Sequence, residues 1–139
     1  MIKILYVDAN MKRGMELKEL LPSSNYSIDV AFTGWEGLGA AMLYHPDIML
    51  LDLLVPVMDG LELLRLLRTE EKHADLPVLG FTTPRNEDFE KQALKMACAG
   101  IFEYPFDVAE LSQLIQQTMS SVEEKKASDE PKDLPTPDK

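Results

Sequence analysis

Two apolar runs of the sequence each end in an aspartate. The run "ILYVD" ends at Asp8, and the run "DIMLLD" ends at Asp52, 44 positions later. Two buried-looking strands that each deliver a carboxylate to the same end of a sheet suggest a functional site. Ala9, beside Asp8, offers no side-chain oxygen where a third carboxylate would help.

Short apolar runs alternate with helical patterns along the chain. The runs predict strands over residues 2–7, 27–33, 47–52, 76–82 and 100–104, and the spacing of apolar residues predicts helices over 11–21, 34–45, 59–71, 86–98 and 107–120. Asp59, Asn86 and Asp107 are the expected N-caps. Strict alternation favours an α/β domain with a parallel sheet and helices on both faces.

The site of such a sheet lies beyond the carboxyl ends of its strands. Asp8, Asp52, Thr82 and Tyr104 stand at or just past the ends of four predicted strands. Topology alone therefore predicts that these side chains share one crevice.

The bulk composition limits the class of protein. The 139 residues fit one domain, predicted over 1–120, followed by a disordered, Pro-rich charged tail over 121–139. The net charge of −10 disfavours partners such as nucleic acids and anionic membranes. One cysteine, no signal peptide and no long apolar run predict a cytoplasmic protein. His45 and His73 fall in predicted loops and are expected to face solvent.

Four segments together resemble the response-regulator receiver domain of two-component signalling: "ILYVD", "HPDIMLLDLLVPVMDGLELLRLLR", "LPVLGFTT" and "YPFDVAEL". The resemblance covers about residues 2–119. It implies a flavodoxin-like (βα)5 three-layer sandwich with a five-stranded parallel sheet in the order 2-1-3-4-5, which agrees with the alternation of strands and helices.

The resemblance also implies roles for individual residues. Asp52 matches the aspartate that accepts a phosphoryl group from a histidine kinase, and Asp8 matches the first of two acids that hold Mg²⁺ beside it. Thr82 matches the switch threonine that senses the phosphoryl group. Pro105 matches the proline that follows the site lysine in the family.

Three positions depart from the pattern of the family. Ala9 replaces the second metal-binding acid, Tyr104 replaces the lysine, and Ile101 replaces the aromatic switch residue. Asp8 and Asp52 alone would hold Mg²⁺ weakly, and the Tyr104 hydroxyl brings no positive charge at neutral pH. A phosphoryl group on Asp52 would be poorly neutralised, which predicts a degenerate receiver that is phosphorylated weakly or not at all. The alternative is a working regulator that is phosphorylated on Asp52 with Mg²⁺.

The expected output is contact with another protein, because the 19 residues after the body leave no room for a DNA-binding or enzymatic domain. The resemblance implies a histidine kinase or a downstream target as the partner, bound through residues 86–119, and leaves a homodimer open. A small enzyme or flavin carrier on the same fold is a remote alternative. Its phosphate-binding loop would follow the first strand, where "DANMKRG" begins with an acid and has glycine late. No hydrolytic motif is present, so no enzyme activity is expected.

Overall fold

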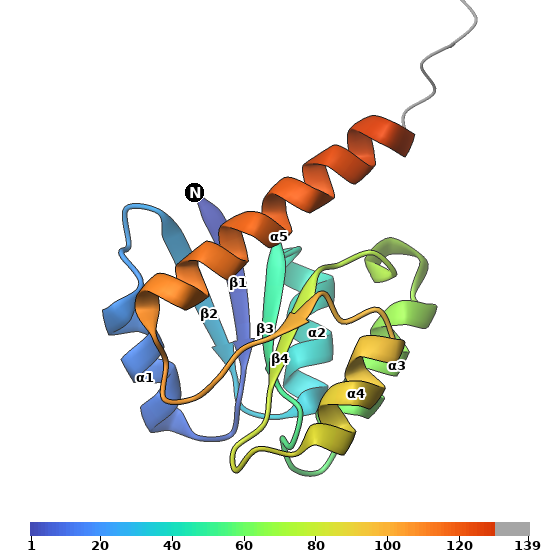
Figure 1. The fold of residues 1–139 in the computed structure, drawn as a ribbon. Coiled ribbons are helices and arrows are strands. Elements are labelled where there is room, and N and C mark those ends of the chain that lie inside the picture. Colours follow the sequence, from blue (N-terminus) through green and yellow to red (C-terminus); the bar gives the residue numbers. More distant parts are fainter. Residues whose placement is uncertain (130–139) are drawn as a thin grey trace, which may run out of the picture.

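The structure, a computed structural model, describes residues 1–129 and contains one sheet of five parallel strands (Figure 1). The strands are β1 (Ile2–Val7), β2 (Tyr26–Ala31), β3 (Ile48–Asp52), β4 (Val78–Phe81) and β5 (Gly100–Ile101). Their order is β2-β1-β3-β4-β5, and every neighbouring pair is parallel. The predicted sheet order is confirmed.

Five α-helices and one short 3-10 helix connect or follow the strands in the described part of the chain. They are α1 (Met11–Leu20), α2 (Gly34–Tyr44), α3 (Gly60–Thr69), η1 (Glu71–His73), α4 (Glu87–Lys95) and α5 (Val108–Asp129). Within residues 1–129, none of these helices has the length and apolarity needed to cross a lipid bilayer.

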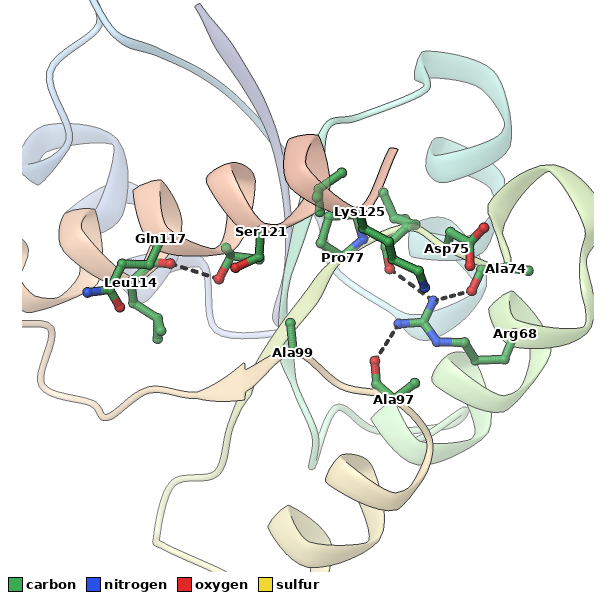
Figure 2. Close-up of a pocket in the computed structure, with 13 residues that line it drawn as sticks. Arg68, Ala74, Asp75, Pro77, Ala97, Ala99, Leu114, Gln117, Ser121 and Lys125 are labelled. Atoms are coloured by element: carbon green, nitrogen blue, oxygen red, sulfur yellow. Dashed lines mark hydrogen bonds between the residues drawn. The ribbon is translucent and has the colours of Figure 1, made fainter. Parts of the chain in front are cut away.

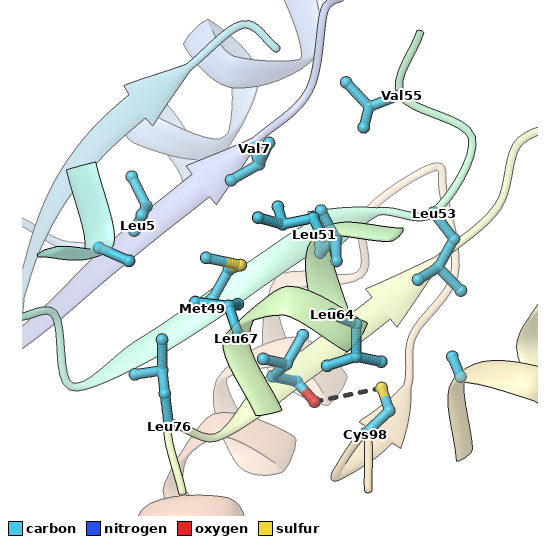
Figure 3. Packing of buried hydrophobic residues seen from close by; sticks show 14 of the residues in the cluster. Leu5, Val7, Met49, Leu51, Leu53, Val55, Leu64, Leu67, Leu76 and Cys98 are labelled. Atoms are coloured by element: carbon cyan, nitrogen blue, oxygen red, sulfur yellow. Dashed lines mark hydrogen bonds between the residues drawn. The ribbon is translucent and has the colours of Figure 1, made fainter. Parts of the chain in front are cut away.

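Alternate strand residues pack into two separate cores, one on each face of the sheet. Leu5, Val7, Met49 and Leu51 face the leucines of α3 (Figure 3), together with Ala41 of α2 and Ala93 of α4. Ile4, Tyr6, Leu50 and Phe81 face Leu17 of α1 and Leu111 and Ile115 of α5. Burial on both sides explains why the central strands read as nearly continuous apolar runs.

The predicted helix starts are confirmed at α3, α4 and α5. The Asp59 carboxylate accepts the backbone N–H of Glu62 at 2.9 Å, and the Asn86 side chain accepts that of Phe89 at 3.1 Å. At the start of α5, the Asp107 carboxylate accepts the backbone N–H of Glu110 at 3.1 Å. Gly60, just after the first cap, has no room for a side chain. A Cβ there would lie 2.5 Å from the Cα of Leu53, so glycine permits α3 to start against the end of β3.

Two predicted boundaries near the C-terminus are wrong. The fifth strand covers Gly100–Ile101 and not residues 100–104. The last helix does not end at residue 120 but continues to Asp129, so the first part of the predicted tail is helical. The predicted disorder of residues 130–139 concerns positions that lie outside the described residues. Helix α5 is the outer layer beside α1 and projects past the amino ends of the strands (Figure 1).

The expectation that His73 faces solvent is also wrong. Its ring is buried and stacks on that of His45, with centroids 5.7 Å apart and planes 6° apart. Neither ring nitrogen of His73 has a hydrogen-bond partner among residues 1–129. The 3-10 turn η1 places this ring against that of His45, which the loop-like local sequence does not indicate.

Arg68 ties three segments together at the amino end of the sheet (Figure 2). Its guanidinium donates to four backbone carbonyls at 2.9–3.2 Å, those of Ala74, Leu76, Met96 and Ala97. Burial lowers the pKa of Arg68. The guanidinium borders a cavity of about 380 Å³ beside α5, at the end of the sheet opposite Asp8 and Asp52.

Candidate functional site

The carboxyl ends of β1, β3 and β4 bring the predicted acids and threonine to one edge. Asp52 ends β3, Asp8 follows β1, and Thr82 follows β4. All three side chains are buried, and Asp8 is 0 % exposed. A buried carboxylate must be paired or hydrogen-bonded, so the groups that contact Asp8 determine the chemistry of this site.

The partner of Asp8 is Arg13, a residue that the sequence analysis missed. The Arg13 Nε donates to Oδ2 of Asp8 at 2.7 Å, and its Nη2 donates to Oδ1 at 2.8 Å. Two parallel bonds of this kind are the strongest geometry for an arginine and a carboxylate. The same Nη2 lies 3.7 Å from Oδ2 of Asp52, so one guanidinium faces both acids. The hydrogen bond to Asp8 raises the pKa of Arg13, which stays charged.

The start of α1 aims Arg13 into the site. Asn10 is the N-cap, and its side-chain oxygen accepts the backbone N–H of Arg13 at 3.0 Å. The Asn10 N–H in turn donates to Oδ1 of Asp8 at 2.9 Å. The cap therefore fixes the backbone of Arg13 while its side chain turns back towards the strand end. The exposed Ala9 lies between Asp8 and this cap and adds no polar group.

A buried tyrosine completes the shell around Asp8. The Tyr6 hydroxyl donates to Oδ2 of Asp8 in a short hydrogen bond. Burial, and then this bond to Asp8, raise the pKa of Tyr6 above its ordinary value, so the hydroxyl keeps its proton. Both oxygens of Asp8 now accept donors from protein groups: Tyr6, Asn10 and Arg13.

Asp52 has a different environment. Its Oδ1 accepts the Leu54 N–H at 2.9 Å. Burial raises the pKa of Asp52 from 3.8 to about 6; the negative charge of Asp8 adds to this rise, and the Leu54 N–H and Arg13 oppose it. At neutral pH most of this carboxyl is ionised, but less completely than an exposed aspartate.

Tyr104 does not take the place of a lysine beside Asp52. Its hydroxyl donates to the Glu16 carboxylate on α1, at 3.1 Å to Oε2 and 3.3 Å to Oε1. The ring lies against the guanidinium of Arg13, whose Cζ is 5.4 Å from the ring centroid. Tyr104 therefore helps to hold Arg13 from outside through a cation–π contact. Pro105 follows Tyr104 through a cis peptide bond.

The partner of Thr82 is another residue that the sequence analysis missed, the buried Glu90 of α4. The Thr82 hydroxyl donates to Oε2 of Glu90 at 2.7 Å and accepts the Asn86 N–H at 2.7 Å. Oε1 of Glu90 pairs with Arg85 at 3.2 Å, and Arg85 also pairs with Glu103 at 3.1 Å. The threonine is thus engaged by α4 through both its proton and its oxygen.

Ile101 lies on β5, half-buried, and packs against the core on the side of α3 and α4. The sheet brings Asp8, Asp52 and Thr82 to one edge, as predicted, and the ring of Tyr104 reaches the same site through its contact with Arg13.

The residues at this edge do not fit a Mg²⁺ ion. Such an ion needs free oxygen ligands at near-octahedral positions. Both oxygens of Asp8 are taken by protein donors, and the positive guanidinium of Arg13 faces Asp52. Among the described residues no cluster of three or more acidic, histidine or cysteine side chains could hold a metal.

Comparison with known proteins identifies the family. The profile of the "Response regulator receiver domain" family matches residues 4–116, most of the chain. The chain belongs to the response-regulator receiver family.

Curated relatives of this receiver chain are response regulators. It is 32 % identical over 114 residues to the response regulator ArlR of Staphylococcus aureus, covering 80 % of this chain and 49 % of that protein. It is 30 % identical over 113 residues to a Porphyra purpurea protein named "Probable transcriptional regulator ycf29", covering 81 % and 54 %. The chain therefore spans about half the length of these relatives.

Solved structures agree with the fold. The chemotaxis response regulator CheY4 of Vibrio cholerae has a TM-score of 0.77 and 24 % identity, over 85 % of this chain and 98 % of that one. The receiver domain of a sensor histidine kinase from Pseudomonas aeruginosa, with a magnesium ion in its active-site cleft, has a TM-score of 0.77 and 24 % identity, over 86 % and 98 %. At this identity both similarities show the flavodoxin-like fold alone.

Proposed function

We propose that this chain is a two-component signalling receiver whose phosphoacceptor site is degenerate, and that it acts through contacts with other proteins. The observation that carries the proposal is Arg13, whose guanidinium lies 2.7 Å from one oxygen of Asp8 and 3.7 Å from Asp52. A fixed cation of the protein stands where the receiver family would place a metal ion. We infer that Mg²⁺ binds weakly or not at all and that Asp52 is phosphorylated slowly or not at all.

The switch threonine supports the same proposal. In the receiver family this hydroxyl senses the phosphoryl group, so it must be free to move. Here Glu90 accepts its proton at 2.7 Å and Arg85 holds Glu90. Breaking this bond would take one of its donors from the buried Glu90 carboxylate, which costs free energy. We infer that the face formed by residues 86–119 keeps one conformation, in which it would meet a histidine kinase or a downstream target without enzymatic activity of its own.

One observation favours the alternative of a working phosphoacceptor. Asp52 is retained, and Arg13 supplies a permanent positive charge close to it. A cation beside the acceptor could neutralise part of the charge that a phosphoryl group brings. The proposal and the alternative differ in whether Arg13 blocks the site or assists phosphorylation of Asp52. One titration distinguishes them.

The test is a titration with Mg²⁺ and beryllofluoride, which mimics a phosphoryl group on aspartate, followed by amide NMR. We expect no saturable shifts around Asp52 and Thr82 in the wild-type chain at millimolar Mg²⁺. The double variant Ala9→Asp, Arg13→Ala gains an acid and loses the blocking cation, and we expect saturable shifts in it. Adding Asp52→Asn to the double variant should abolish these shifts. Saturable shifts in the wild type that Asp52→Asn removes would contradict the proposal and establish the alternative.

A further inference from the structure

Helix α2 presents an apolar outer face. Gly34, Gly37 and Ala41 are buried on its inner side. On the opposite side Trp35 is 61 % exposed, Leu43 73 % and Met42 40 %. Scattered exposed apolar residues need no explanation, but a tryptophan and two large aliphatic side chains on one face of a helix form a patch of the kind that marks an interaction site.

This outer face carries few charges in a strongly acidic chain. The net charge is −10, and 27 % of all residues are charged. Helix α2 carries a single charged residue, Glu36, and its Oε2 accepts the backbone N–H of Phe32 at 2.9 Å. Two copies of an acidic protein repel each other over most of their surfaces. The α2 face is a place where two copies can approach with fewer like charges in contact than elsewhere on the surface.

The face also carries a projection and a matching gap. Gly39 lies one turn after Trp35 and one turn before Leu43, and a Cβ at Gly39 would have no heavy atom within 4 Å. Residues four apart lie next to each other on a helix surface. If two α2 helices cross about a twofold axis, the indole of each copy can cover Gly39 of the other. The same face thus carries both the projecting indole and the gap that receives it. Such a face is self-complementary, as a twofold interface requires.

The size of the patch suits a weak dimer. The exposed parts of Trp35, Met42, Leu43 and the neighbouring Phe32 amount to roughly 400 Å² of apolar surface, since a buried aromatic side chain covers about 150–250 Å². A standard interface buries about 800 Å² per partner. The patch would thus supply about half of each side, and the polar surface around it the rest.

We propose that the outer face of α2, formed by Trp35, Gly39, Met42 and Leu43, binds a second copy of this chain about a twofold axis. The interface is distinct from residues 86–119, through which we expect contact with signalling partners. It also makes no use of Asp52 or Arg13. Dimer formation is therefore independent of whether Asp52 is phosphorylated.

Sedimentation velocity of the full chain tests this dimer, over a dilution series from about 1 µM to about 1 mM, the range in which small interfaces dissociate. Trp35 is the one tryptophan of the sequence, so intrinsic fluorescence reports on this face without a label. We expect the mass to rise to twice that of one chain with concentration, and the tryptophan emission to shift to shorter wavelength over the same range.

Two matched variants locate the interface. Leu43→Glu places a charge in the α2 face, and we expect at least a tenfold weaker dimer and no emission shift. Leu94→Glu makes the same change at an exposed leucine of α4, and we expect the dimer to remain. Circular dichroism shows whether both variants keep the fold. A wild-type chain that stays monomeric at every concentration overturns the proposal, as does a dimer that Leu94→Glu disrupts and Leu43→Glu does not.

Discussion

At the scale of single residues, one guanidinium changes what the carboxylates of this site can do. Without Arg13, the buried carboxylate of Asp8 would need another positive partner, as the carboxylate of a metal site does. With Arg13 bound through two hydrogen bonds, the same carboxylate is satisfied by the protein itself. The chemistry of Asp52 then depends on a neighbour that stands five residues after Asp8 and belongs to a different element.

Asp52 gives a prediction about pH. Its pKa is raised from 3.8 to about 6 in the folded protein, so between these values the native state binds more protons than the unfolded state. Stability from this group is therefore lost as pH rises through that window. We expect Asp52→Asn, which keeps an oxygen for the Leu54 N–H, to be more stable than the wild type by about 2 kcal/mol at pH 8.

Urea unfolding of both proteins at pH 8, 6 and 4 measures this difference. We expect the advantage of Asp52→Asn to shrink as the pH falls, because the wild-type carboxyl is then protonated and neutral. Comparing the two proteins at each pH cancels the titration of the other acids. An advantage that stays constant across the series would mean that ionisation of Asp52 is not its cause.

At the scale of elements, side chains near the ends of helices form hydrogen bonds that link one element to another. The first turn of α1 supplies Arg13, and the first turn of α4 supplies Glu90 for Thr82. At the other end of the sheet, Arg68 near the end of α3 binds carbonyls that precede β4 and that follow α4. These hydrogen bonds join elements that are far apart in the sequence and fix their relative positions.

Arg68 gives the prediction at this scale. The planar guanidinium of Arg68 donates to four backbone carbonyls, and a lysine ammonium cannot reproduce that geometry. We expect Arg68→Lys to lower the free energy of unfolding by about 2 kcal/mol, because partly buried carbonyls lose their donors. Urea unfolding at pH 7 measures the change.

Arg65 on the same helix is the matched control. It pairs with Glu62 at the surface, where both side chains are largely exposed. Exposed pairs contribute little, so Arg65→Lys should leave the free energy of unfolding nearly unchanged. Equal losses from both variants would show that the carbonyl network of Arg68 is not what stabilises this end of the sheet.

At the scale of the whole molecule, the surplus of acidic residues matters for stability and association. A net charge of −10 on a chain of 139 residues gives a self-repulsion that favours the unfolded chain and separated copies. Salt screens the largely buried Arg13–Asp8 ion pair only slightly, whereas it screens the repulsion between surface charges strongly.

Salt should therefore stabilise this protein. We expect that raising NaCl from about 10 mM to about 200 mM increases the free energy of unfolding by on the order of 1 kcal/mol, as the screening length falls from about 30 Å to under 10 Å. Thermal unfolding in NaCl and KCl measures the effect, and sulfate is avoided because it strengthens apolar burial by another route. A midpoint that stays constant or falls with added salt would contradict this account.

The sequence by itself determined the order of strands and helices, three of the helix caps and the edge where Asp8, Asp52 and Thr82 meet. These features follow from apolar periodicity and capping residues, which are local, whereas the sheet order was implied by the resemblance to the receiver family. The ends of β5 and α5 were predicted wrongly, because the length of a short edge strand and of a projecting helix depends on what packs beside them.

The partners of the buried polar groups were decided only by the tertiary structure. A basic residue in the first turn of a helix is unfavourable for the helix dipole, so Arg13 did carry a signal that it needs a carboxylate nearby. Nothing in the local sequence indicates that Asp8 is that carboxylate, that Glu90 holds Thr82, or that Tyr104 turns to Glu16. Hydrogen bonds between elements depend on the distances that packing sets, and these distances exist only once the sheet and helices are assembled.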